Sequence, residues 1–433
     1  MKIPVKEWKN YSAQEKNRLL RRSEEDISQV MPAVQKILER VQHGGDGALR
    51  ECTKEFDKVD LGDLPLRVQP QEIQAAYGLL SAEVLGALKY SIDNVKKYHK
   101  SQIPEAMSMV EVRPGLLAGE RATSIESCGL YVPRGRGSFP SMTYMLAVPA
   151  HLAGVERIVM VTPPNSDGSV DPACLVAADL CGVHEIYRVG GAQAIAALTW
   201  GTETLLPVLK IVGPGSMFVS AAKRLLAHVV DVGLPAGPSE SAILADESSD
   251  PWITALDLLV EAEHGADSSA ILVTPSLSLA QKVAQHLEAE VELLTPPRRG
   301  FVEAVFSGYG GIILVPTLEE GAQLINDYAP EHLIVRTTHD WSTLSLIRNA
   351  GEIILGSQVP FSAANYATGP NAVLPTGGKA KTWSPVSVRD FMKFSSVITA
   401  DAKGYQDFAP HVVALSHYEG FQTHAHAITK RKH

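Results

Sequence analysis

Gly311-Ile312-Ile313-Leu314-Val315 and His332-Leu333-Ile334-Val335 are two short, β-branched runs separated by a segment with a helical pattern. Runs of the same kind recur at Ala270-Ile271-Leu272-Val273 and at Glu352-Ile353-Ile354-Leu355. Short β-branched runs that alternate with helical segments are typical of a parallel sheet built from βαβ units. Residues 270–355 are therefore predicted to form such a sheet.

An earlier block of the chain repeats this pattern. Its apolar runs are Arg157 to Val161, Glu185 to Val189 and Val208 to Val212, with segments rich in Ala and Leu between them. Two such blocks predict an α/β fold with a duplicated, Rossmann-like architecture, although no residue-level repeat connects them. Residues from about 12 to 100 are predicted to be mainly helical, and a small C-terminal unit is expected after Pro375-Thr376-Gly377-Gly378.

Composition limits the possible partners. The 433 residues are 45% apolar and 20% charged, which is enough to bury more than one core. A net charge of −9 without a Lys/Arg block argues against nucleic acid or an anionic membrane as the main partner. No segment resembles a signal peptide or a membrane span, and the four cysteines show no disulfide or metal pattern. We therefore expect a reduced, cytoplasmic protein.

The segment Tyr328-Ala329-Pro330-Glu331-His332-Leu333 places a carboxylate and an imidazole on adjacent residues at the start of an apolar strand. Neighbouring strand residues point to opposite faces, so one side chain is expected to point inward and the other toward solvent or a cleft. An acid and an imidazole this close can share proton transfer near neutral pH. Glu-His pairs are also common on protein surfaces, so a pair without catalytic function is the alternative interpretation.

A second group of polar residues lies at the end of a predicted helix. Asp250 and Pro251 form an N-cap and a first helical residue, and Gly265 is predicted to end the helix. Glu261 and His264 are three residues apart and therefore share one helix face. This pair could chelate zinc. Alternatively, a charged histidine simply stabilises the negative end of the helix beside a local acid.

Three glycine-containing turns and a C-terminal segment are more ambiguous. The turns Gly190-Gly191, Gly213-Pro214-Gly215-Ser216 and Gly237-Pro238-Ser239 follow or connect predicted strands, where glycine can admit a phosphate or only form a tight turn. Near the C-terminus, His424 and His426 would point about 200° apart on a helix, so at most one would face a given site.

Over nearly its full length, the chain resembles the histidinol dehydrogenase family. The resemblance is carried by motifs in the same order as in that family: Leu130-Tyr131-Val132-Pro133, Gly190 to Ala194, Pro235 to Glu240, Ala262-Glu263-His264-Gly265, Tyr328 to Leu333, Gly369-Pro370-Asn371, Val373 to Gly378 and Ser387 to Phe391. It implies an enzyme that oxidises L-histidinol to L-histidine through an aldehyde in two NAD⁺-dependent steps. It also implies an intertwined homodimer with one zinc per subunit.

The resemblance assigns roles to individual residues. Glu331 and His332 correspond to the catalytic acid/base pair. The implied zinc ligands are Glu261, His264, Asn365 and His424, and the partner subunit would supply the last of these. The implied substrate contacts are Ser239, Glu261, His264, His332, Asn365, Glu419 and His424, and the implied NAD contacts are Tyr131, Gln193 and Ser216.

Four positions depart from the family pattern. Glu261 replaces a glutamine and Asn365 replaces an aspartate, which moves one carboxylate across the metal while preserving the total ligand charge. Ser216 replaces an asparagine that would contact NAD, and a serine has fewer hydrogen-bond donors. Ala372 replaces a usual histidine. These changes leave open a relative that oxidises another small polar alcohol, or a non-catalytic relative.

The resemblance also implies the domain organisation. Residues 1–27 are expected to form an N-terminal helical arm, and residues 28–130 with 241–378 a first Rossmann-like domain that carries the metal and acid/base residues. Residues 131–240 are expected to form a second Rossmann-like domain on the NAD side. Residues 379–433 are expected to form a C-terminal helical extension that reaches the partner subunit.

Overall fold

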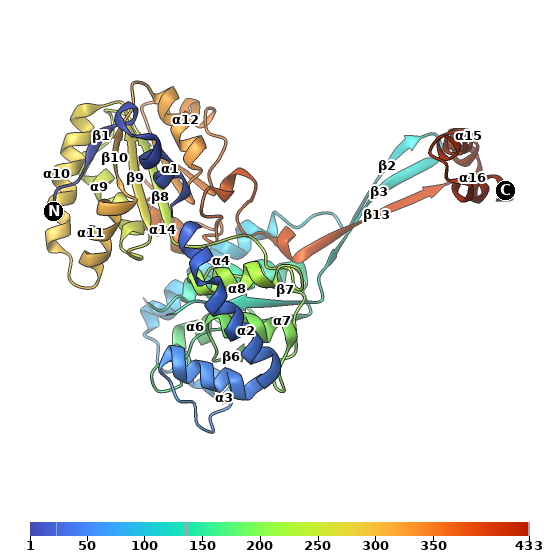
Figure 1. Ribbon diagram of the computed structural model, residues 1–433, viewed down its shortest axis with the longest axis horizontal. Coiled ribbons are helices and arrows are strands. Elements are labelled where there is room, and N and C mark those ends of the chain that lie inside the picture. Colours follow the sequence, from blue (N-terminus) through green and yellow to red (C-terminus); the bar gives the residue numbers. More distant parts are fainter. Residues whose placement is uncertain (23, 135–136, 432–433) are drawn as a thin grey trace.

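The computed structural model describes residues 1–22, 24–134 and 137–431. The chain forms two α/β units, each with a parallel sheet, and a long antiparallel arm that projects away from both units (Figure 1). No helix in these described ranges is long and apolar enough to cross a membrane.

The first unit contains a six-stranded parallel sheet with helices on both faces. The strands in spatial order are β1 (Val5–Glu7), β10 (Gly311–Leu314), β9 (Ser269–Thr274), β8 (Glu240–Ala245), β11 (His332–Arg336) and β12 (Glu352–Leu355). Helices of one face are α9 (Pro251–Ala262), α10 (Leu277–Leu293), α11 (Arg298–Gly308) and α14 (Phe361–Tyr366). Helices α1 (Ala13–Arg21) and α12 (Leu318–Tyr328) cover the other face, and the short α13 (Asp340–Leu344) follows β11.

The second unit contains a four-stranded parallel sheet. The strands in spatial order are β6 (Glu185–Tyr187), β5 (Arg157–Val161), β4 (Ser127–Tyr131) and β7 (Lys210–Val212). One core is formed with α3 (Pro70–Tyr77), α4 (Ala82–Lys100), α5 (Pro140–Ala153) and α6 (Pro172–Leu180). The other is formed with α2 (Glu24–Cys52), α7 (Gly191–Trp200) and α8 (Met217–Leu226), and η2 (Thr53–Asp57) follows α2.

This packing corrects two predicted domain boundaries. The helices of residues 28–130 pack on the four-stranded sheet and not on the six-stranded one, because the apolar faces of α2 and α4 meet α7, α8 and α5. Of residues 241–378, the segment 367–373 also contacts α4. The N-terminal segment 1–27 is not purely helical, since β1 forms an edge strand paired with β10. The seven predicted strands are all present, with ends that differ by at most two residues.

The arm combines distant parts of the chain. The strands β2 (Met107–Arg113), β3 (Leu116–Ser124) and β13 (Met392–Ala400) form an antiparallel sheet, and α15 (Ala402–Tyr418) and α16 (Gln422–Thr429) lie at its far end (Figure 1). Residues 379–433 thus contain a nine-residue strand besides the expected helices and the short turns η3 (Lys379–Lys381) and η4 (Val388–Phe391). Several apolar side chains of the arm are exposed: Val110, Ile398, Leu415 and Tyr418.

The connections between the two units lie close together. Thr376 Oγ1 accepts a hydrogen bond of 2.7 Å from the backbone N–H of Gly237, and Gly377 N–H donates to Glu240 Oε1 at 2.8 Å. One connection enters β8, and the other leads from the first unit toward the arm. These contacts fix the first unit to the second next to the start of β8.

Lys223 on α8 is buried, with 8% of its surface exposed, and donates a hydrogen bond to the carbonyl of Gly213. Burial disfavours the charged ammonium and lowers the pKa of Lys223 to about 7, although Asp231 partly opposes this shift. Between pH 7 and the ordinary pKa of lysine, the unfolded chain therefore binds more protons than the folded protein. Stability should increase with pH across this window.

We expect the free energy of unfolding of the native protein to increase with pH, relative to a Lys223→Met variant, by up to about 1.4 kcal/mol per pH unit from pH 7 to 10. Denaturant titrations at a series of pH values measure this difference. A Lys89→Met variant, which changes an exposed lysine, is the control. Parallel pH profiles for the native protein and Lys223→Met would contradict the assignment.

Candidate active site

The amino edge of the six-stranded sheet gathers polar residues from three strands. Glu240 begins β8, His332 begins β11 and Glu352 begins β12. The parallel register places His332 opposite Glu352. Helix α9 connects parallel strands and therefore runs back across the sheet, so its last turn brings Glu261 to the same edge.

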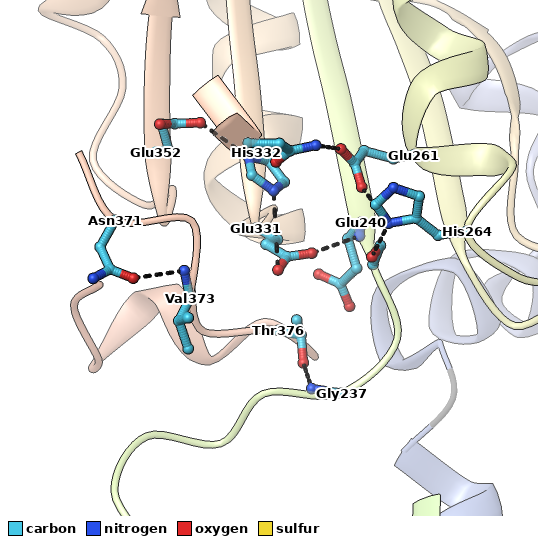
Figure 2. Close-up of polar contacts among 12 residues, drawn as sticks. Gly237, Glu240, Glu261, His264, Glu331, His332, Glu352, Asn371, Val373 and Thr376 are labelled. Atoms are coloured by element: carbon cyan, nitrogen blue, oxygen red, sulfur yellow. Dashed lines mark hydrogen bonds and ion pairs between the residues drawn. The ribbon is translucent and has the colours of Figure 1, made fainter. Parts of the chain in front are cut away.

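His332 lies between two carboxylates (Figure 2). Its Nδ1 is 2.9 Å from Glu352 Oε2, and its Nε2 is 4.0 Å from Glu331 Oε1. Glu331 Oε2 accepts a hydrogen bond of 2.9 Å from the backbone N–H of Glu240. The imidazole is therefore oriented by one acid while its other nitrogen faces a second acid, an arrangement suited to proton transfer.

Glu331 and His332 do not point to opposite sides as predicted. Both are buried, with exposures of 8% and 2%, and their polar atoms approach each other. The reason is that β11 begins only at His332, so Glu331 belongs to the preceding turn. Ala329 in this turn has φ +49°, a left-handed conformation that is uncommon for a residue with a side chain.

Burial and neighbouring charges set the protonation of this pair. Burial opposes the imidazolium, but the charges of Glu261, Glu352 and Glu331 together raise the pKa of His332 to about 9. Burial disfavours the charged carboxylate of Glu331, and its pKa is raised well above the ordinary value despite the nearby imidazole. Burial and neighbouring charges thus shift the pKa of both groups, as is common for residues that transfer protons in an active site.

Glu261 and His264 meet as their spacing predicts. Glu261 Oε2 is 3.2 Å from Nδ1 of His264, and Nδ1 also lies 3.0 Å from Ser239 Oγ. Asn365 Nδ2 donates a hydrogen bond of 2.7 Å to Glu261 Oε1. The predicted N-cap at Asp250 is confirmed, but the helix ends at Ala262 and not at Gly265.

These side chains are of the kinds that bind zinc. Glu261 Oε2 is buried and faces the imidazole of His264, so a cation held there would contact both side chains. In the described part of this chain, no three His, Cys, Asp or Glu side chains are grouped to hold a metal ion. A complete zinc site would therefore also need the amide oxygen of Asn365, obtained by rotating its amide group, and a donor from outside this group.

Glu419 and His424 are not brought to this cluster within one chain. Glu419 caps the end of α15 and His424 lies on α16, and both are exposed at the far end of the arm (Figure 1). The other predicted substrate-site residues, Ser239, Glu261, His264, His332 and Asn365, do belong to the cluster at the sheet edge.

The predicted dinucleotide contacts lie at the carboxyl edge of the four-stranded sheet. The backbone N–H of Gly191 donates a 3.0 Å hydrogen bond to the hydroxyl of Tyr131 at the end of β4, and Gln193 follows on α7. Ser216 is the exposed N-cap of α8. Gly213 packs against the Tyr131 carbonyl, where a side chain would not fit. These turns therefore adjoin each other.

A cavity of about 460 Å³ opens beside His264. It is lined from both units, by residues that include Ser138, Ser141, Glu263, Arg298 and Tyr366. Its size suits a small organic molecule. Ala372, the fourth departure from the family pattern, lies apart from this cavity in the core of the second unit.

Two residues at the centre of the site were not singled out from the sequence. Glu352 orients His332, and the Glu240 backbone holds Glu331. A signal was present, because Glu352 and His332 each begin an apolar run of similar length. Only the strand register places these two starting residues opposite each other.

Together the two parallel sheets, the cavity between the units and the buried acid–imidazole pair define a two-unit α/β enzyme. A family model for histidinol dehydrogenase matches residues 20–432. The chain belongs to the histidinol dehydrogenase family, a family of oxidoreductases.

Individual relatives agree with this assignment. A histidinol dehydrogenase homolog of Rhizobium meliloti (strain 1021) is 50% identical, with coverage of 98% of this chain and 93% of the relative. A histidinol dehydrogenase of Synechocystis sp. is 47% identical, with coverage of 97% and 96%. The crystal structure of histidinol dehydrogenase from Elizabethkingia anophelis has a TM-score of 0.91 at 35% identity and covers 97% of this chain and 96% of that one.

Proposed function

We propose that this protein oxidises L-histidinol to L-histidine in the cytoplasm, as a homodimer that uses zinc and two molecules of NAD⁺. The observation that carries this proposal is the buried series Glu352–His332–Glu331 beside Glu261 and His264, in a chain of this family. Histidine biosynthesis is the corresponding role.

Two residues move the protons of both oxidations. His332 accepts the proton of the substrate hydroxyl while the carbon loses a hydride, which gives the aldehyde. Glu331 then takes a proton from a water molecule that attacks the aldehyde carbon, and His332 returns its proton to the aldehyde oxygen, which gives the hydrate. His332 accepts a hydroxyl proton of the hydrate as the second hydride leaves, and the acid formed ionises to the carboxylate. Glu352 keeps the imidazole of His332 in the required orientation through its 2.9 Å contact. NAD⁺, when bound, accepts each hydride.

Zinc, when bound, would polarise and orient the amino alcohol. Glu261, His264 and Asn365 of one subunit and His424 of the partner would hold it. The charge of this set equals that of the family pattern, because Glu261 and Asn365 exchange one carboxylate for one amide. The buried Glu261 carboxylate, whose Oε2 lies 3.2 Å from His264 Nδ1, supports Glu261 as the stronger oxygen ligand.

The shared site depends on the arm. The arm exposes apolar side chains, such as Ile398 at 70% and Tyr418 at 90% exposure. Exposed apolar side chains of this kind are typical of a surface that a second subunit covers. The arm would then bring Glu419 and His424 to the partner's cavity. The two parallel sheets of similar construction support a duplicated, Rossmann-like origin, and the turn at Tyr131, Gln193 and Ser216 would hold NAD on the second unit.

A second candidate substrate is another small polar alcohol. The altered metal ligands Glu261 and Asn365 would contact the group next to the reacting carbon. Of the four departures from the family pattern, these two therefore favour the alternative substrate most. Ala372 is buried in the apolar core of the second unit, away from the cavity. The replacement of the usual histidine at this position therefore says nothing about the substrate.

The assay that tests the proposal uses purified, zinc-loaded protein with NAD⁺ and measures NADH at 340 nm on the order of minutes. We expect L-histidinol to give two NADH for each histidine formed, and L-histidinal to give one. A panel of amino alcohols and hydroxy acids serves as the comparison. A higher kcat/KM for a panel compound than for histidinol would support the alternative substrate. No turnover of any compound, with no dinucleotide binding, would contradict an enzymatic role.

A further inference from the structure

Arg22 is a buried arginine that no step of the proposed mechanism uses. It lies directly after α1, where the chain leaves the first unit for the second, and its side chain is 2% exposed. Its φ of +54° is uncommon for a residue with a side chain. A buried guanidinium in such a conformation has to be held by strong contacts.

The first of these contacts is with Glu240. Arg22 Nε lies 2.7 Å from Glu240 Oε1, and the N–H of Gly377 donates to the same oxygen at 2.8 Å. Glu240 in turn donates its backbone N–H to Glu331 Oε2 at 2.9 Å (Figure 2). One carboxylate therefore connects Arg22 and the segment at Gly377 to the residue whose backbone holds Glu331.

The second set of contacts is with Tyr328, three residues before Glu331. Arg22 Nη1 donates a 2.9 Å hydrogen bond to the Tyr328 carbonyl, and the guanidinium lies 4.0 Å from the centre of the Tyr328 ring. The Tyr328 hydroxyl is fixed by a 2.7 Å hydrogen bond to Ser269 Oγ. The guanidinium thus holds the turn that precedes Glu331 as well as the strand beside it.

We propose that Arg22 is a positioning residue that fixes the carboxylate of Glu331 from both sides and links its position to the junction of the two units. This inference rests on the proposed function, in which Glu331 activates water for oxidation of the aldehyde. The carboxylate of Glu240 is buried next to Glu331, and Arg22 is the cation that contacts it. Loss of Arg22 displaces Glu331 more than His332, because His332 keeps its contact with Glu352.

The test compares two substrates in Arg22→Gln, Arg22→Lys and a matched control. With Arg22→Gln, we expect kcat for histidinal oxidation to decrease about tenfold to a hundredfold, with KM nearly unchanged and a smaller decrease for the alcohol step. Arg22→Lys should recover part of this loss, because the cation is retained. Arg21→Gln changes the neighbouring, exposed arginine and should leave both steps unchanged.

A further variant separates positioning from folding. Arg22→Gln/Glu240→Gln leaves no unpaired charge at this position, so it should melt closer to the native protein than Arg22→Gln and still be slow with histidinal. Two results would overturn the proposal. One is an equal decrease in kcat for the alcohol and aldehyde steps in Arg22→Gln. The other is a double variant that regains both the native melting temperature and the native rate with histidinal.

Hydrogen exchange provides a readout that does not depend on the substrate. We expect amides of residues 328–333 to exchange at least about tenfold faster in Arg22→Gln than in Arg21→Gln, since the turn loses its fixed partner. Unchanged exchange in folded Arg22→Gln would overturn the positioning role. Failure of the native protein to oxidise histidinol would instead refute only the proposed substrate, and the exchange measurement would still decide the inference.

Discussion

Replacement of His332 by asparagine is expected to lower kcat for both oxidations by about a hundredfold to ten-thousandfold. Asparagine can donate a hydrogen bond to Glu352 but cannot accept a proton, so the hydroxyl of the alcohol and the hydrate of the aldehyde both lose their base. The buried position of His332, with 2% exposure, keeps water from replacing it. Steady-state rates with histidinol and histidinal as separate substrates measure the two losses.

Glu331→Gln is the matched comparison for this prediction. It retains the shape of the side chain and can still accept the hydrogen bond from Glu240, but it cannot take a proton from water. We expect it to slow mainly the oxidation of histidinal. Equal losses in His332→Asn and Glu331→Gln for both substrates would show that the two residues do not have separate roles.

The second large effect is expected when a zinc ligand is removed, because the proposed ligands come from two subunits. His264→Ala and His424→Ala should each lose bound zinc and activity, because each removes one ligand from every site. A hybrid dimer that contains one subunit of each variant should recover one complete site. In that site, the intact His264 of one subunit meets the intact His424 of the partner.

Coexpression with two affinity tags isolates the hybrid dimer, and metal analysis with the NADH assay measures recovery. We expect about one zinc per hybrid dimer and about half of the native activity. Glu261→Ala should also lose zinc and Asn365→Ala should lose less. A hybrid without activity, or full zinc occupancy in both of these alanine variants, would contradict the proposed ligand set.

The strands of both parallel sheets could be predicted with little error where they are apolar and β-branched. The run from Glu352 to Leu355 is a strand with the predicted ends, because each of its residues favours extended backbone. The strands β4 and β8 were not predicted as such, since Ser127–Tyr131 and Glu240–Ala245 contain small or polar residues that carry little periodic signal. Strand β1 is only three residues long and depends on its partner β10.

The site was predictable in part. The spacing of Glu261 and His264 alone was enough to predict that they meet, because three residues on a helix subtend nearly one turn. The family resemblance indicated Glu331, His332, Ser239 and Asn365, and the structure brings these residues to one sheet edge. Neither source indicated that helices of residues 28–130 would pack on the second unit, since their apolar faces fit either sheet by pattern.

The sequence by itself therefore determined the apolar, β-branched strands of the parallel sheets and the short-range pairs that share a helix face. Those properties depend on residues within about one turn of each other, so local periodicity records them. Only the tertiary structure decided that Glu352 orients His332, that Glu240 holds Glu331 and that Arg22 contacts Glu240. These contacts join residues 20 to 218 positions apart. They are created by strand register and by the packing of the two units, which no local sequence pattern encodes.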